Sequence, residues 1–106
     1  MNSTEFTKHL EQMQRITVET LKAKAAEYAT NGDRLHNFRV AAAIEGVSKY
    51  AALGGMMAKH TVSVYDLIRY ADQGTAVPKD LWEEKIKDSI NYLFLLWAMV
   101  NEEEKK

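Results

Sequence analysis

The stretch PKDLWEEKIKDSINYLFLLWAMVN, residues 78–101, decides the fold of this chain because it reads as one long helix. Pro78 suits a first helical position, where its missing N–H is not needed, and acidic residues in the next turn complement the helix dipole. Apolar residues then recur at helical spacing from Leu81 to Val100. From Tyr92 to Val100 the helix is apolar nearly all round, which predicts a central position or a place in a subunit interface.

The rest of the chain is predicted to wrap this helix as an all-α, four-helix single domain over residues 1–106, with a bundle-like arrangement. No segment alternates with period two, so no strand is expected. A chain of this length has little apolar surface to spare after building one core, so the all-round apolar stretch predicts a homo-oligomer. The helices are expected at about 4–29, 34–45, 48–73 and 79–101.

Capping residues set these boundaries. Ser3 or Thr4 is a candidate N-cap for the first helix, Asp33 for the second and Ser48 for the third. Gly46 is placed to end the second helix, as a C-terminal glycine does.

Two features inside the helices carry further predictions. The first helix has an apolar stripe predicted to face inward, which includes Phe6 and Leu10 and also carries Lys24. Lys24 is read either as an ammonium that reaches water or as a cation aimed into a site near Tyr28. Gly54-Gly55 in the third helix predicts a bend or a close contact with another helix.

The composition is that of a globular domain, with 46% hydrophobic and 27% charged residues. The formal net charge of −1 argues against a protein that coats nucleic-acid polymers, because such proteins carry a strong basic excess. The chain has no cysteine, which excludes disulfides, zinc–thiolate sites and thiol catalysis. No apolar run reaches the length of a membrane span and the N-terminus lacks a signal-peptide pattern, so we expect no membrane partner and a cytoplasmic location.

The turn before the second helix carries the first cluster that could hold a ligand. A helix N-terminus with arginine and histidine nearby is a natural anion site, and plain capping with surface charge is the alternative. The cluster consists of Tyr28, Asp33, Arg34, His36, Asn37 and Arg39.

Two polar strips on later helices are read either as ligand-binding strips or as solvated faces. On the last strip two carboxylates lie one turn apart, an arrangement that holds Mg²⁺ through water. The strips are Lys59, Ser63 and Asp66 on the third helix, and Glu84, Asp88 and Asn91 on the last. His60 lies alone on the apolar side of the third helix, where a histidine is more often a satisfied core residue than a ligand or base.

Three short motifs resemble those of small phage-encoded helical proteins. YATNGDRLHNF at 28–38 resembles their tyrosine, turn, aspartate and Asn-Phe signature, and Met57-Ala58-Lys59-His60 resembles their Met-x-Lys segment. KIKDSINY at 85–92 resembles their Lys-x-x-Asp-x-x-Asn-Tyr helix. The resemblance covers about residues 24–98. The small phage proteins that the chain resembles are similar to the MazG-like all-α nucleotide pyrophosphatases and the phage nucleotide-modification-associated domains.

The acid set departs from this family. Catalytic MazG-like enzymes carry a Glu-Glu-x-x-Glu on one helix and a Glu-x-x-Asp on another, and these residues together hold Mg²⁺. This chain has Glu84-x-x-x-Asp88 and no Glu-Glu-x-x-Glu. The resemblance therefore implies a nucleotide-shaped helical site with an incomplete catalytic acid set.

These observations predict that the protein binds a small phosphorylated nucleotide without turnover and without a cofactor or metal. In a phage setting it would act as a sponge for a host nucleotide immune signal, in the host cytoplasm. One alternative is a Mg²⁺-dependent MazG-like nucleoside-phosphate pyrophosphohydrolase that uses Glu84 and Asp88, and another is a structural or partner-binding helical protein. The ligand is expected in a cleft completed by a second subunit. The predicted ligand-binding residues are Tyr28, Arg34, His36, Asn37, Phe38, Arg39, Lys59, Ser63, Asp66, Asp88 and Asn91.

Overall fold

The structure is a computed structural model that describes residues 1–28 and 32–103, and within them all side chains except those of Ala26, Tyr28 and Glu103. The described residues form helices and no strand, which confirms the predicted all-α fold. The helices are α1 (Ser3–Tyr28), α2 (His36–Glu45), α3 (Lys49–Asp72) and α4 (Lys79–Glu103).

The helices begin and end at residues that satisfy their terminal backbone groups. Ser48 caps α3, as predicted, because its hydroxyl accepts the Ala51 N–H at 3.1 Å. Gly46 ends α2 in the left-handed conformation with φ 70°, also as predicted. The cap of α1 is Asn2 instead of Ser3 or Thr4, since the Asn2 side chain accepts the Glu5 N–H at 2.9 Å. The Glu5 carboxylate accepts the Asn2 N–H in return, which completes a capping box.

Helix α2 begins two residues later than predicted, at His36 instead of Arg34. Asp33 does not cap the helix directly, because α2 begins at His36 and its cap position, Leu35, provides no side-chain hydrogen bond. The Asp33 carboxylate instead accepts the Leu35 N–H at 3.0 Å and stabilises a turn ahead of the helix. Arg34 therefore lies in a turn and not in the first helical turn.

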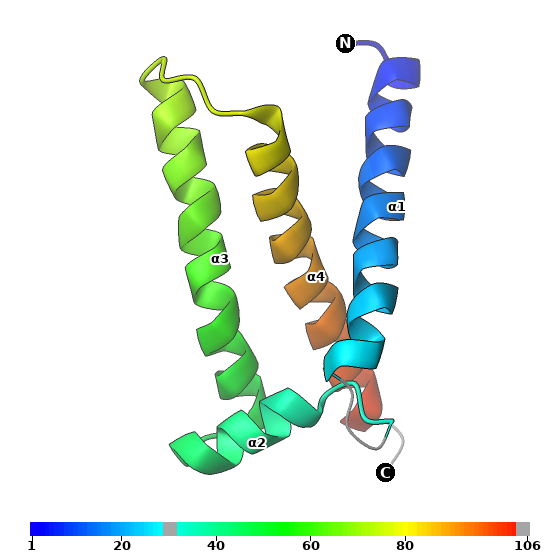
Figure 1. Cartoon of the computed structure of the whole chain (residues 1–106), viewed down its shortest axis with the longest axis vertical. Helices are drawn as coiled ribbons and strands as arrows, with labels where there is room; N and C mark the ends of the chain where they lie inside the picture. The colour runs from blue at the N-terminus through cyan, green and yellow to red at the C-terminus, as the bar shows by residue number, and fades with distance from the viewer. Residues whose placement is uncertain (29–31, 104–106) are drawn as a thin grey trace.

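The long helices α1, α3 and α4 lie in a layer, with α4 between the other two (Figure 1). Both α1 and α3 pack against α4, and α2 packs against α3. α1 and α4 run in the same direction and α3 runs opposite to them, while α2 crosses the end of the layer where α3 begins (Figure 1). α4 thus has the central place that its apolar sequence predicts.

The core lies where α2 meets α3 and α4. Its buried side chains are Leu35, Phe38, Leu53 and Met99. Burying a side chain of this size stabilises the fold by roughly 1.5–3 kcal/mol. Tyr92 and the apolar residues around it pack against this cluster, so the middle of α4 is anchored to the core.

One prediction about the helices is wrong. The first turns of α1 do not face inward, because Phe6 and Leu10 are exposed. At Gly54-Gly55 no neighbouring helix comes close, since an added Cβ at either glycine would meet no atom of another described element within 4 Å, and the alternative of a bend stays a prediction. Among the described residues, no helix is long and apolar enough to cross a membrane.

Candidate functional site

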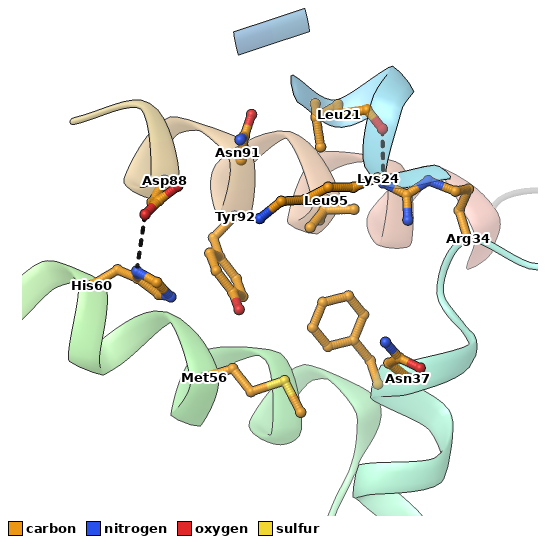
Figure 2. Close-up of a pocket in the computed structure, with 11 residues that line it drawn as sticks. Leu21, Lys24, Arg34, Asn37, Met56, His60, Asp88, Asn91, Tyr92 and Leu95 are labelled. Carbon is orange, nitrogen blue, oxygen red and sulfur yellow. Dashed lines mark hydrogen bonds and ion pairs between the residues drawn. The ribbon is translucent and has the colours of Figure 1, made fainter. Parts of the chain in front are cut away.

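A cavity of about 260 Å³ opens between α1, the turn before α2, and helices α2, α3 and α4 (Figure 2). Every helix contributes to its wall, so the cavity exists only in the folded chain. Its lining residues are Leu21, Lys24, Arg34, Asn37, Phe38, Met56, His60, Asp88, Asn91, Tyr92 and Leu95.

Aromatic rings form one part of this wall. The ring of Tyr92 lies 4.8 Å from that of His60 at an interplanar angle of 31°, which is a tilted stack. Phe38 meets Tyr92 edge to face, with ring centroids 6.3 Å apart. Because Phe38 and Tyr92 also belong to or contact the core, these rings are held in place by packing.

Two cations lie in the wall on the side of α1 (Figure 2). Arg34 donates from Nη2 to the Leu21 carbonyl at 3.4 Å, its one hydrogen bond within the described part of the chain. This bond directs the guanidinium along the end of α1, and a guanidinium carries further N–H donors. Lys24 extends from α1 toward Tyr92 (Figure 2). Among the described residues that line the cavity, one carries a carboxylate, Asp88, compared with the two cations.

Asp88 faces His60 across the cavity (Figure 2). Its Oδ2 lies 3.9 Å from His60 Nδ1, which is beyond hydrogen-bond distance. Both side chains are mostly buried, with exposed fractions of 18% and 21%. A ligand donor placed between them would find a carboxylate acceptor within a partly dry site.

Asn91 is the most unusual polar residue of the wall. Only 6% of it is exposed, and its Oδ1 has no hydrogen-bond partner among the described residues. A buried acceptor without a partner costs about 1–3 kcal/mol. Native proteins contain few such groups. This oxygen has almost no accessible surface, so a ligand in the cavity would reach the Asn91 side chain through its other atoms.

The structure brings together five of the predicted ligand-binding residues. They come from the turn before α2, from α2 itself and from α4. These five are Arg34, Asn37, Phe38, Asp88 and Asn91.

Arg39, a predicted ligand-binding residue, lies outside the cavity in an ion-pair cluster. Its guanidinium donates to the Asp33 carboxylate at 2.8 Å and to the carboxylate of Glu102. Lys49 completes the cluster by donating to Glu102 at 2.9 Å. Arg39 is thus already neutralised by two carboxylates, whereas Arg34 is not paired with one among the described residues.

The charges of this cluster are mutually stabilised. Hydrogen bonds from Arg39 and then Lys49 lower the pKa of Glu102 to about 2. Arg39, followed by the Leu35 N–H, lowers the pKa of Asp33. In return, the hydrogen bonds to Glu102 and Asp33 raise the pKa of Arg39. This pattern is that of a structural clamp between α2, α3 and the end of α4.

The predicted strip on α3 also lies outside the cavity. Lys59 is exposed, and the Ser63 hydroxyl donates to the Lys59 carbonyl at 3.0 Å within the helix. Asp66 accepts from Arg69 at 2.9 Å. These contacts are local ones along one helix.

The remaining predicted residues lie in three different settings. His36 is half-buried at the start of α2 but does not line the cavity. The side chain of Tyr28 lies outside the described residues. Glu84 is exposed and does not line the cavity, one turn from Asp88. Within residues 1–28 and 32–103, no group of three or more acidic or histidine side chains is arranged to hold a metal.

Sequence reasoning missed part of the wall. His60 was expected in a core, yet it lies in the cavity next to Tyr92. The spacing in the sequence is consistent with this position. Met56 and His60 are one turn apart on α3, and Asp88 and Tyr92 are one turn apart on α4, so each pair lies on one side of its helix. Lys24 had been read in two ways, and the structure places it in the cavity wall.

Comparison of the chain with protein-family models, with curated proteins and with solved structures finds no match. The resemblance to MazG-like and phage nucleotide-modification proteins therefore stays a prediction.

Proposed function

We propose that this protein binds a small phosphorylated nucleotide in the cavity between its four helices. The observation that carries the proposal is the combination of two cations, an aromatic wall and the amide of Asn91 around one cavity. Pockets for small ligands are typically apolar with a few convergent polar groups, and this cavity has that composition.

Each group of the wall has a part that suits its chemistry. Arg34 and Lys24 are the phosphate ligands, because cations in a partly dry site form charge-assisted hydrogen bonds with phosphate oxygens. A base packs against the rings of Phe38 and Tyr92. Asn91 and Asp88 contact the edge of the base or a ribose hydroxyl.

The size of the cavity favours a small member of this class. Ligand pockets typically measure about 300–1,000 Å³, and this one has about 260 Å³. We therefore propose a mononucleotide in preference to a dinucleotide or a longer ligand.

We propose that the protein binds this nucleotide without hydrolysing it. In a phage setting, such binding would sequester a host nucleotide signal. The hydrolase alternative assigns Mg²⁺ to Glu84 and Asp88, and an activity assay distinguishes the two. Incubation with nucleoside mono-, di- and triphosphates and Mg²⁺, followed by measurement of phosphate and pyrophosphate, is expected to show no release. Release that is lost in Asp88→Ala would favour the hydrolase.

Calorimetric titration with mononucleotides carrying one to three phosphates tests the binding site. We expect at least one of them to bind, and Arg34→Ala to weaken that binding about ten- to a hundredfold, because a hydrogen bond to a charged group is worth about 1.5–3 kcal/mol. Lys59→Ala is the matched control, since Lys59 is an exposed cation outside the cavity.

The control variant is expected to bind like the parent. Circular dichroism checks that Arg34→Ala keeps its helix content, because Arg34 also bonds to the Leu21 carbonyl. Equal binding by Arg34→Ala and the parent, or no binding of any of these nucleotides by the parent, would contradict the proposed site.

A further inference from the structure

The chain exposes more surface than a compact monomer of its size. Its accessible surface is 7453 Å², whereas about 6,000 Å² is typical of a monomer of this mass. The radius of gyration is 16.1 Å, compared with about 13 Å for a compact domain of this length. The surface excess, roughly 1,400 Å², is within the area that each subunit of an obligate dimer buries, about 1,000–2,500 Å².

Three of the exposed large apolar side chains among the described residues lie on one face of α4. Leu93 is 56% exposed and Trp97 66% exposed, and Val100 continues the same face. A soluble chain normally hides side chains of this size, and an aromatic residue such as Trp97 dominates the energetics of an interface when it is buried.

The spacing of this face is that of a helix–helix seam. Its apolar residues recur at intervals of four, three, four and three positions, which is the heptad pattern of paired helices. They are Ile86 and Ile90, which are half-buried, and the exposed Leu93, Trp97 and Val100. We name these five residues the α4 seam. Ile86 also borders a groove that it shares with Met13 and Ile16 of α1.

The α4 seam and the cavity lie on different sides of α4. With about 100° of rotation per residue, Leu93 lies about 200° around the helix from Asn91, which lines the cavity. A partner on the seam therefore leaves the cavity open.

We infer that the α4 seam pairs with the α4 seam of a second copy of this chain. A second copy is the occupant that fits both observations, since heptad spacing is typical of helices that pair and the surface excess lies within one subunit's share of an obligate dimer interface. In this dimer each subunit keeps its own cavity. The partner does not complete the ligand site, in contrast to the expectation from the sequence.

Engineered disulfides test the seam directly, because the natural chain has no cysteine. Leu93→Cys places two thiols across the proposed interface, where a disulfide can form. Val62→Cys is the matched control, because Val62 is 58% exposed on α3, a fraction close to that of Leu93. Under mild oxidation we expect the Leu93→Cys protein to become a covalent dimer and the Val62→Cys protein to remain mostly a single chain.

Mass measurement by light scattering provides the second test. The parent chain is expected to have twice the 12.1 kDa mass of one chain at micromolar concentration. Trp97→Glu is expected to give a monomer that keeps its helix content, because a charge in an apolar seam has no partner. The matched control Tyr65→Glu, at a site also 66% exposed, is expected to stay dimeric.

A monomeric parent chain, or equal crosslinking of the two cysteine variants, would overturn the inference. A Trp97→Glu protein that remains a dimer would also overturn it. None of these measurements involves a nucleotide, so their outcome is independent of the proposed function.

Discussion

At the scale of single residues, the buried amide of Asn91 links stability to binding. Its Oδ1 has no hydrogen-bond partner among the described residues, and the side chain lines the cavity. Replacing Asn91 with leucine removes a desolvated acceptor and keeps the branching of the side chain, so we expect the free energy of unfolding to rise by about 1 kcal/mol. Nucleotide affinity is expected to fall, because the variant loses a contact to the ligand. Urea denaturation and calorimetric titration measure the two effects.

Ser89 provides the control for this prediction. Its Oγ is also buried without a hydrogen-bond partner among the described residues, but Ser89 does not line the cavity. Ser89→Ala is therefore expected to leave nucleotide affinity unchanged. An Asn91→Leu protein that is less stable than the parent would mean that the amide makes a contact essential to the ligand-free fold.

At the level of the helices, two glycines differ in backbone conformation, and replacing each with alanine is expected to change stability in opposite directions. Gly46 ends α2 with φ 70°, a conformation that costs other residues roughly 1–2 kcal/mol, so Gly46→Ala is expected to destabilise the protein. Gly55 lies inside α3, where an added Cβ would meet no described atom within 4 Å. Gly55→Ala is expected to stabilise the protein by about 1 kcal/mol, because alanine has the higher helix propensity.

Thermal unfolding followed at 222 nm compares these two variants with the parent. A Gly55→Ala variant less stable than the parent would indicate that another surface, such as a second subunit, packs on this part of α3.

At the scale of the whole molecule, the ion-pair cluster around Glu102 joins segments far apart in the sequence. The lowered pKa of Glu102, about 2 against an ordinary value of 4.5, means that its carboxylate stabilises the fold in the charged form. This contribution is complete above about pH 4.5 and is lost as the pH falls toward 2. We therefore expect Glu102→Gln to be less stable than the parent at neutral pH, with the difference disappearing on acidification.

Thermal unfolding at a series of pH values between neutral and 2 measures this difference. Glu84→Gln is the matched control, because Glu84 is an exposed carboxylate on the same helix but outside the cluster. A Glu102→Gln variant whose deficit is the same at every pH would show that its effect is one of packing and not of charge.

The helices and the central place of α4 can be predicted from the sequence alone. Helical periodicity, the Gly46 and Ser48 caps and the apolar run in α4 depend on interactions within a few turns, so the local sequence is sufficient to predict them. The same local spacing placed Asp88 and Asn91 on one side of α4, and both line the cavity.

Which polar side chains share a site depends on how the helices pack, and the sequence does not reveal it. Arg34 and Arg39 have the same charge and lie in the same region of the sequence, but Arg39 pairs with Glu102, 63 residues away, while Arg34 lines the cavity. Lys59 and His60 are neighbours in sequence, and the packing of α3 against α4 directs His60 into the cavity and leaves Lys59 exposed. Periodicity gives the angles between residues on one helix, but it does not give the rotation of that helix against its neighbours. That rotation is set by burial of the core where α2, α3 and α4 meet, which involves contacts between distant parts of the chain.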